Sequence, residues 1–326
     1  MNQMITIREQ VRIKDFISRN GMILFLYIFT IALFFIGKII SKDYLDPRHI
    51  GAILRTASFI GFVSIGQTLV ILSGGIDLSV GSLVTMGNVF MCIFQQGNDS
   101  NNLWSFIVII LLGLAIGTIS GLGVSFLKIP PIVMTLAIGS LVTGFVLIFS
   151  KGAPTGYASP LLHEIGVGYL WGSIPIVVII WVVFSILMIF LLSKTTYGRR
   201  LYLVGASNKV ANFSGVNVPI VTTIAYALSG AFAVLAGVFM AGYTLNAFLG
   251  IGNEYTMWSI TAVVIGGTSL SGGKGGYLGT IAGAIILVLL ESLLTIVNVP
   301  DAGRKIAGGL IILIMITIYF RKPRNS

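Results

Sequence analysis

The stretch GQTLVILSGGIDLSVGS, residues 66–82, joins two long apolar runs through a glycine-rich break that carries one acidic side chain, Asp77. A carboxylate placed mid-membrane costs about 2.5–3.5 kcal/mol on insertion scales. Non-helical backbone is tolerated at that depth only where protein buries it or where it lines a water-filled cavity. Two interpretations stay open, and both can hold. The stretch is a structured break beside a path through the membrane, or a turn in which Asp77 and Ser79 cap the following helix.

The composition of the chain excludes a water-soluble globular protein. Of the 326 residues, 56% are hydrophobic and only 9% are charged, and the mean hydropathy is +1.00. A soluble domain carries about 25% charged residues, because its water-facing surface needs them. The surroundings of this chain must therefore be mostly membrane lipid, and we predict a polytopic integral membrane protein.

Apolar runs long enough to cross a bilayer recur along the chain. A bilayer core about 30 Å thick needs about 20 apolar residues per helix. We predict an all-α transmembrane bundle of about ten spans with broken or re-entrant glycine-rich segments. The spans cover residues 22–40, 52–72, 78–95, 104–127, 132–149, 173–193, 219–241, 256–268, 277–297 and 304–320. They form a single transmembrane domain, 22–320, between basic tails at 1–21 and 321–326, with a cytoplasmic loop at 194–218.

The distribution of basic residues predicts the orientation of the spans. The net charge is +10, and Lys and Arg gather in two tails and one central loop, the pattern of segments held on the cytoplasmic side. Even numbers of predicted spans separate the three clusters, so both termini are predicted to be cytoplasmic, and a nucleic-acid partner is not expected. The clusters are Arg8, Arg12, Lys14 and Arg19; Lys194, Arg199, Arg200 and Lys209; and Arg321, Lys322 and Arg324.

Small residues recur at every fourth position in two of the predicted spans. Gly113, Gly117 and Gly121 follow one another in one span, and Gly279 and Gly283 do so in another. Small residues at this spacing let helix backbones approach closely. We interpret them as packing within one subunit in preference to a seam between two copies.

A second glycine-rich break, GGTSLSGGKG at residues 266–275, echoes the first. The pattern Gly-Gly-x-x-Leu-Ser-x-Gly occurs in both, and paired glycine-interrupted segments in the two halves of a transporter point to its core. Both breaks fall on the cytoplasmic side of the predicted topology, where a simple five-plus-five inverted repeat would not place them. The internal repeat is therefore only suggested.

The loop YGRRLYLVGASNKVANFSGV, residues 197–216, mixes apolar and charged residues at helical spacing between glycines. This pattern predicts short helices that dock on a partner or lie against the membrane surface. The residues assigned to this contact are Gly198, Arg199, Arg200, Gly205, Ala211 and Gly215.

Several classes of site are missing from the sequence. There is no Gly-x-x-x-x-Gly-Lys-Ser/Thr phosphate loop, so ATP is not hydrolysed by that mechanism in this chain. His49, His163 and the single Cys92 form no metal-ligand pattern and no catalytic set, so neither an enzyme, a metal nor a cofactor is predicted. Other polar residues of the membrane regions are interpreted first as structural hydrogen-bonding groups: Gln67, Asn88, Asn246, Glu254 and Glu291.

Several motifs together resemble the ribose-type permease family of ATP-binding-cassette importers. They occur in order over about four-fifths of the chain, and their combination is specific. They are GQTLVI (66–71) running into GGIDLSVG (74–81), the glycines of the 198–216 loop, YALSG (226–230) and VVIGGTSLSGGKG (263–275).

The resemblance implies a membrane subunit that works as a dimer, of two identical or two different permeases, in the bacterial inner membrane. It implies two further partners, a cytoplasmic ATPase that docks on the 198–216 loop and a periplasmic or lipid-anchored solute-binding protein. Family substrates are mostly pentoses and hexoses. The residues assigned to the substrate pathway or its signature are Gln67, Gly74, Gly75, Asp77, Ser79, Gly81, Asn88, Gly266, Gly267 and Ser269.

Two departures from the family pattern keep alternatives open. Relatives carry a Glu-Leu-Asp-like run before the second break, where this chain reads YTMW at 255–258 with Glu254 beside it. Relatives also carry a Gly-Gly-Asn-Glu-like run in the docking loop, where this chain reads GASN at 205–208. We expect an importer permease for a monosaccharide. The alternatives are a permease for a nucleoside, a branched-chain amino acid or a sugar-like signal molecule, or an ATP-independent secondary transporter.

Overall fold

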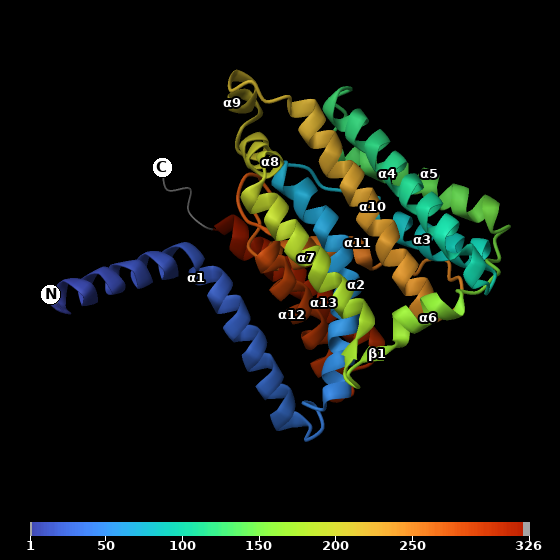
Figure 1. Ribbon diagram of the computed structural model, residues 1–326, viewed down its shortest axis with the longest axis horizontal. Helices are drawn as coiled ribbons and strands as arrows, with labels where there is room; N and C mark the ends of the chain where they lie inside the picture. The colour runs from blue at the N-terminus through green and yellow to red at the C-terminus, as the bar shows by residue number, and fades with distance from the viewer. Residues whose placement is uncertain (1, 322–326) are drawn as a thin grey trace.

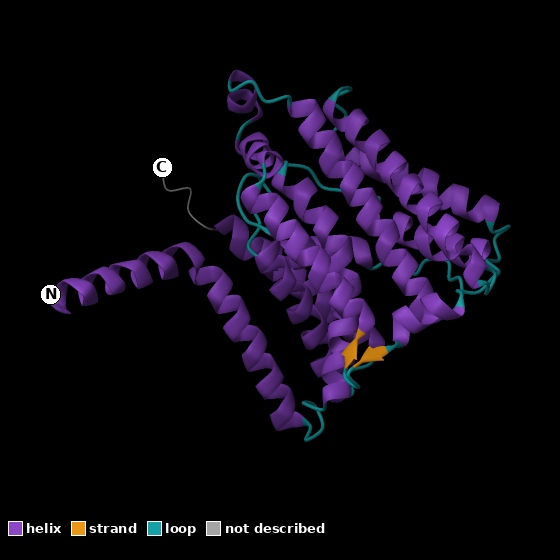
Figure 2. Cartoon of the chain, in the orientation of Figure 1, coloured by secondary structure: helices purple, strands orange, loops and turns teal. Residues whose placement is uncertain are grey.

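The computed structural model describes the backbone of residues 2–321 and the side chains of residues 21–310 and Leu313. Within this part, the chain is a bundle of helices with one short hairpin of strands (Figures 1 and 2). A helix occupies each predicted span: α1 (Asn2–Ile40), α2 (Pro47–Leu72), α3 (Val80–Gln95), α4 (Asn102–Ser125), α5 (Pro131–Phe149), α7 (Ile176–Lys194), α10 (Val218–Thr244), α11 (Tyr255–Ile265), α12 (Tyr277–Ile296) and α13 (Asp301–Arg321).

Seven helices of the described part are long and apolar enough to cross a membrane: α1 from Gly21, α2, α4 (with the turn before it), α5, α7, α10 and α12. Helices α3 and α11 are apolar but shorter, with 16 and 11 residues. Large apolar side chains such as Phe25, Ile148 and Ile186 are exposed on the outer helices, as expected of surfaces that meet lipid. The prediction of an all-α polytopic membrane protein is confirmed.

The tails fall largely outside the described residues. Lys322 and Arg324 of the predicted C-terminal tail lie outside them, as do the side chains of Arg321 and of the N-terminal basic cluster. The backbone of residues 2–20 is helical and continues into the first span as one helix, α1. No proline interrupts this segment, and proline is the residue that most strongly ends a helix.

Several short elements connect the long helices. They are η1 (Asp99–Asn101), α6 (Pro160–Val167), α8 (Thr196–Ala206), α9 (Asn208–Phe213), and the strands β1 (Tyr169–Leu170) and β2 (Ile174–Pro175). The strands pair antiparallel, with Tyr169 opposite Pro175. Helices α8 and α9 are the short helices predicted for the 194–218 loop. Helix α6 was not predicted; it starts where the Ser159 hydroxyl accepts a hydrogen bond from the Leu162 amide, with Pro160 as its first residue.

The core of the bundle lies around α10, which packs against α2, α3 and α4. Close approach at α4 depends on glycine, because a Cβ built on Gly230 would lie 2.2 Å from the Gly113 carbonyl oxygen. In the same way, a Cβ on Gly279 of α12 would lie 1.9 Å from the Gly266 carbonyl oxygen, just after α11. The two glycine repeats therefore pack helices within one subunit, as predicted.

The bundle has two distinct ends (Figure 1). At one end lie α8, α9, the second glycine-rich segment and Met22 of α1, whose sulfur lies close to Gly267. At the other end lie the hairpin and the turn after α1. Near this turn, the Nε2 atom of His49 in α2 lies 3.4 Å from the Ser292 hydroxyl of α12. We call these the α8 end and the hairpin end.

Candidate functional site

The first break, between α2 and α3, is held by a buried carboxylate. Gly74, two residues after the end of α2, has a φ of +88°, a conformation that glycine adopts without strain. Asp77 is completely buried. Its Oδ1 accepts hydrogen bonds from the Ser79 amide (3.0 Å) and hydroxyl (2.6 Å), and its Oδ2 accepts one from the Ser229 hydroxyl of α10 (2.8 Å). The hydrogen bond to Ser229 ties the break to α10.

The capping role predicted for Asp77 takes a different form in the structure. Asp77 bonds to Ser79, the N-cap residue of α3, rather than to the first turn of the helix. The first turn is bonded from another element, because the Gly81 amide donates to the Thr256 hydroxyl of α11 (3.1 Å). On the opposite side, the Leu78 amide donates to the Thr135 hydroxyl of α5 (3.0 Å). Three helices therefore fix the backbone of the break.

Two polar groups near this break are buried without a hydrogen-bond partner in the described part of the chain. Both amide atoms of Gln67 are in this state, and so is the hydroxyl of Tyr226. A Cβ built on Gly75 would lie 2.3 Å from the Tyr226 oxygen. A buried unpaired polar group costs about 1–3 kcal/mol. Gln67 contacts no described cavity, so its place on the substrate pathway stays a prediction.

The second break is a turn between α11 and α12 that is closed by hydrogen bonds within the segment. Gly267 has a φ of +83°, the Ser269 amide donates to the Lys274 carbonyl (2.9 Å), and the Gly276 amide donates to the Thr268 hydroxyl (3.2 Å). The backbone of α12 packs closely against this break at Gly266.

The two breaks touch each other, although almost 200 residues separate them in the sequence. The Gly273 amide donates a hydrogen bond to the Leu72 carbonyl, the last of α2 (3.0 Å). A Cβ on Gly272 would lie 3.0 Å from the backbone of Gly74. The sequence pattern related the two segments to each other, but nothing in it predicted this contact.

Helix α8 reaches the same point. A Cβ on Gly205 would lie 1.8 Å from the Leu72 carbonyl oxygen and 2.5 Å from the Gly273 nitrogen. The Tyr202 hydroxyl donates to the Gly275 carbonyl (2.8 Å). Burial raises the pKa of Tyr202, which keeps this donor protonated. We call the contact of Gly74, Gly205, Gly272 and Gly273 the glycine junction; it joins all three sequence-predicted stretches.

The rest of the 194–218 loop contains both exposed and buried residues. Arg199 and Arg200 are exposed on α8, whereas Gly198 is buried against the end of α7. On α9, Ala211 is buried and Phe213 is 87% exposed. Gly215 follows with a φ of +74° at the turn into α10. Sequence reasoning missed Phe213, although a large apolar residue at the end of an otherwise polar helix is a signal of contact.

A hollow of about 590 Å³ lies between α3, α5 and the start of α11. Small and hydroxyl residues line much of it: Gly81, Ser82, Gly139, Ser140, Thr143, Gly144, Asn253 and Thr256. We call it the α3–α5 groove. Ser140 and Thr143 are exposed in the middle of α5 and donate to carbonyls four residues earlier. Their spacing along α5 was a signal available in the sequence, and it was overlooked.

Asn88 stabilises the loop that leads to α11 and lines none of the described hollows. Its Oδ1 accepts from the Phe248 amide (2.8 Å). In the same way, the Thr85 hydroxyl accepts from the Gly252 amide (3.1 Å). These bonds position Asn253 beside the groove.

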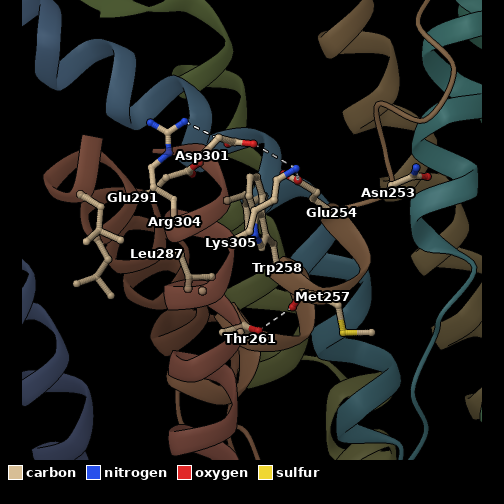
Figure 3. A pocket seen from close by; sticks show the side chains of 15 residues that line it. Asn253, Glu254, Met257, Trp258, Thr261, Leu287, Glu291, Asp301, Arg304 and Lys305 are labelled. Atoms are coloured by element: carbon tan, nitrogen blue, oxygen red, sulfur yellow. Dashed lines mark hydrogen bonds and ion pairs between the residues drawn. The ribbon is translucent and has the colours of Figure 1, made fainter. Parts of the chain in front are cut away.

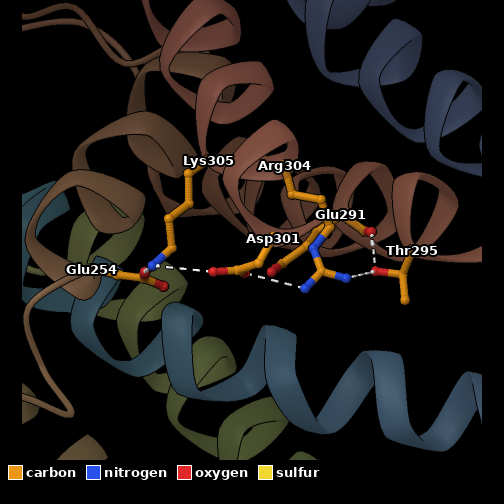
Figure 4. A network of polar contacts seen from close by, with 6 residues as sticks. All are labelled: Glu254, Glu291, Thr295, Asp301, Arg304 and Lys305. Atoms are coloured by element: carbon orange, nitrogen blue, oxygen red, sulfur yellow. Dashed lines mark hydrogen bonds and ion pairs between the residues drawn. The ribbon is translucent and has the colours of Figure 1, made fainter. Parts of the chain in front are cut away.

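A second hollow, of about 360 Å³, lies at the hairpin end between α11, α12 and α13 (Figure 3). We call it the α11–α13 pocket. Trp258, Glu254 and Thr261 line it from α11, and Glu291 lines it from α12. Four of its five charged side chains form a chain of ion pairs from Glu254 to Arg304 (Figure 4). The sequence analysis named Glu254 and Glu291 as structural groups and did not place them in one cavity.

Comparison with known proteins adds independent findings. Residues 49–316 match the family model described as branched-chain amino acid transport system / permease component. The chain is 32% identical to the ribose import permease protein RbsC of Bacillus subtilis over 327 residues, which cover 98% of each chain. It is 34% identical to the protein of the same name from Haemophilus influenzae over 298 residues, covering 89% of this chain and 90% of that one.

A third relative has a different name. The autoinducer 2 import system permease protein LsrC of Shigella flexneri is 32% identical over 288 residues, covering 87% of this chain and 82% of the relative. No solved structure gives a significant match. The matched region contains both glycine-rich breaks, the α8–α9 loop and the α3–α5 groove. The chain belongs to the permease family whose model is described as branched-chain amino acid transport system / permease component.

Proposed function

We propose that this chain is the membrane permease subunit of an ATP-driven importer in the bacterial inner membrane. The observation that carries the proposal is the glycine junction, where α8 contacts both glycine-rich breaks. A force applied to α8 from the cytoplasm would act directly on the backbone that leads into α3 and into α12. Packed glycine contacts with no spare space respond to such a force by switching between arrangements, which is the basis of alternating access.

The proposed topology has ten spans with both termini cytoplasmic. Ten helices occupy the predicted span positions of the described chain. Met22, at the start of the first span, lies at the α8 end beside Gly267. The basic clusters of the N-terminal tail and of the 194–218 loop then share one side of the membrane, as the positive-inside rule requires.

The proposed partners are a cytoplasmic ATPase, a solute-binding protein outside the membrane and a second permease subunit. The ATPase would contact α8 and α9, where Arg199, Arg200 and Phe213 are exposed. ATP would be bound by that partner, because this sequence contains no phosphate loop.

The proposed solute is a monosaccharide that passes along the α3–α5 groove. Two relatives are named as ribose import permeases. The exposed hydroxyls of Ser140 and Thr143 donate within α5 and leave their acceptor lone pairs to a polar solute inside the membrane region. The family description and the autoinducer 2 relative keep an amino acid and a sugar-like signal molecule as alternatives.

Reconstitution tests the proposal. The chain would be co-expressed with the ATPase and the binding protein encoded beside it, and ATP turnover would be measured with and without each monosaccharide. We expect turnover that depends on both the binding protein and its sugar. Turnover that no combination of binding protein and solute stimulates would contradict the proposal.

A further inference from the structure

The α11–α13 pocket is a second polar cavity that lies apart from the groove. Its volume of about 360 Å³ is in the range of about 300–1,000 Å³ typical of small-molecule sites. It lies at the hairpin end, since α12 ends and α13 begins there. In the proposed topology this end faces the outside, where the solute arrives.

The wall of the pocket combines an aromatic ring with apolar surface. Trp258 is half-buried, and its ring packs edge-on against Tyr255 with centroids 5.5 Å apart. Ile60 of α2 and Leu287 of α12 line the pocket as well. An aromatic ring held in one orientation beside hydrogen-bonding groups suits a ligand with one apolar and one hydroxylated face.

Four of the five charged side chains of the pocket are paired with one another (Figure 4), and the Glu291 carboxyl group forms no ion pair in the described part of the chain. Lys305 lies 3.2 Å from Glu254 and 3.5 Å from Asp301. Arg304 lies 3.2 Å from Asp301 and donates to the Thr295 hydroxyl (2.9 Å). An anion would have to break these pairs, whereas a neutral polyol can add hydrogen bonds to them, because each hydroxyl is both donor and acceptor.

One residue lines both the pocket and the groove. Asn253 lines both hollows, and Figure 3 shows it at the edge of the pocket next to Glu254. A solute that leaves the pocket on this side would meet the α3–α5 groove at Asn253 and Thr256.

We propose that the α11–α13 pocket is an outward-facing binding site for a neutral polyhydroxylated solute of monosaccharide size. Trp258 is the stacking surface, and Asn253, Glu254 and Arg304 contact the hydroxyls. The solute passes from this pocket to the groove. The proposal rests on the proposed function, because it identifies where the imported solute is first held.

Thiol protection tests the site directly. Cys92 is the only cysteine, so a Cys92→Ala, Met257→Cys chain carries a single thiol, at a pocket-lining position that is 51% exposed. A membrane-impermeant maleimide would be applied from outside to the assembled complex, with D-ribose, D-glucose or L-leucine as the protecting molecule. At about ten times the dissociation constant of a bound sugar, labelling should slow by about tenfold, because the rate follows the unoccupied fraction. The matched control is Trp171→Cys, 85% exposed in the hairpin turn, which no solute should protect.

Each outcome decides the proposal. Protection of position 257 by a monosaccharide, lost in Trp258→Ala and partly restored in Trp258→Phe, supports it. Absence of protection by every sugar, in a complex whose unmodified chain imports a sugar, overturns the site and leaves the proposed function intact. Protection by leucine alone overturns the polyol class. Absence of ATP-driven sugar import by the unmodified chain overturns both the site and the proposed sugar substrate.

A transport measurement separates binding from folding. Trp258→Ala should lower sugar uptake by at least about tenfold at a low sugar concentration, a loss of about 1.4 kcal/mol of binding. Trp104→Ala is the matched control, because Trp104 is 45% exposed, its ring packs against Phe94 of α3, and its indole N–H donates to Asn101 of η1. Co-purification with the ATPase should be the same for both variants. Equal uptake by both would contradict the proposal.

Discussion

Asp77 is the residue on which the geometry of the first break depends. It accepts three hydrogen bonds, and the bond from Ser229 is its only described link to another helix. A carboxylate with no cation among these partners is stabilised by hydroxyl and amide dipoles alone, so each of them matters.

Ser229→Ala should therefore destabilise the protein by about 1–3 kcal/mol, because Oδ2 of a buried carboxylate loses its partner. The change would be measured as a lower melting temperature in detergent. Ser140→Ala is the matched control, since its exposed hydroxyl bonds only to its own helix and its removal should change stability by less than about 0.5 kcal/mol. Equal melting temperatures for the two variants would show that Asp77 does not depend on α10.

Among the elements, α8 is the one that contacts both breaks. Its contact with Leu72 and Gly273 leaves no space for a side chain at position 205. The neighbouring atoms belong to backbone, which cannot rotate away as a flexible side chain would.

Gly205→Ala should separate α8 from the breaks and reduce ATP-coupled transport by about tenfold or more, because overpacking of about 1–3 kcal/mol must be relieved by moving backbone. Uptake and ATP turnover would be measured together, and we expect ATP turnover to persist without uptake. In Gly21→Ala, where a Cβ meets nothing within 4 Å, both should stay normal. Normal uptake in Gly205→Ala would remove the junction from the mechanism.

Helix α9 carries a separate prediction. Phe213 is 87% exposed, and a large aromatic side chain at the centre of an interface is worth about 2 kcal/mol or more. Phe213→Ala should weaken binding of the ATPase by about 30-fold, as measured by co-purification or by titration in nanodiscs. Trp171→Ala, equally exposed at the hairpin end, should bind the ATPase normally. A Phe213→Ala chain that retains its ATPase would show that α9 contacts lipid or water instead.

The long elements could be predicted from the sequence, and their contacts could not. An apolar run of about 20 residues has few alternatives to a transmembrane helix, so the prediction 132–149 lies within one residue of α5. Helix α2 starts earlier than predicted, because Asp46 accepts a bond from the Arg48 amide and Pro47 is the first helical residue. Helix α6 and the hairpin are too short to show periodicity.

The glycine junction could not be predicted from the sequence, for a different reason. Each of its three segments could be recognised locally, by glycine spacing and by charge. Their meeting depends on long-range packing of α2, α8 and the 266–276 segment, which no local pattern encodes. The residues predicted for the substrate pathway differ in position. Gly81 lines the α3–α5 groove, whereas Gln67 and Asn88 are buried and line none of the described hollows.

For the whole molecule, an ATPase on the cytoplasmic side can reach α8 in only one orientation of the chain in the membrane. With ten spans, positions 209 and 216 face the cytoplasm, and positions 43 and 171 face outside. Single cysteines at Lys209, Asp43 and Trp171 in a Cys92→Ala background would be labelled with an impermeant reagent in intact cells. We expect labelling at 43 and 171 only. Labelling at 209 in intact cells would invert the topology and place α8 out of reach of any cytoplasmic ATPase.

The coupling of uptake to ATP tests the central claim most directly. The chain, its ATPase and the sugar-loaded binding protein would be reconstituted in proteoliposomes, and labelled monosaccharide uptake would be followed with ATP, without ATP and with an uncoupler. The account predicts uptake that requires ATP and the binding protein and that an uncoupler leaves unchanged. Uptake that proceeds without ATP and collapses with the uncoupler would show a secondary transporter and contradict it.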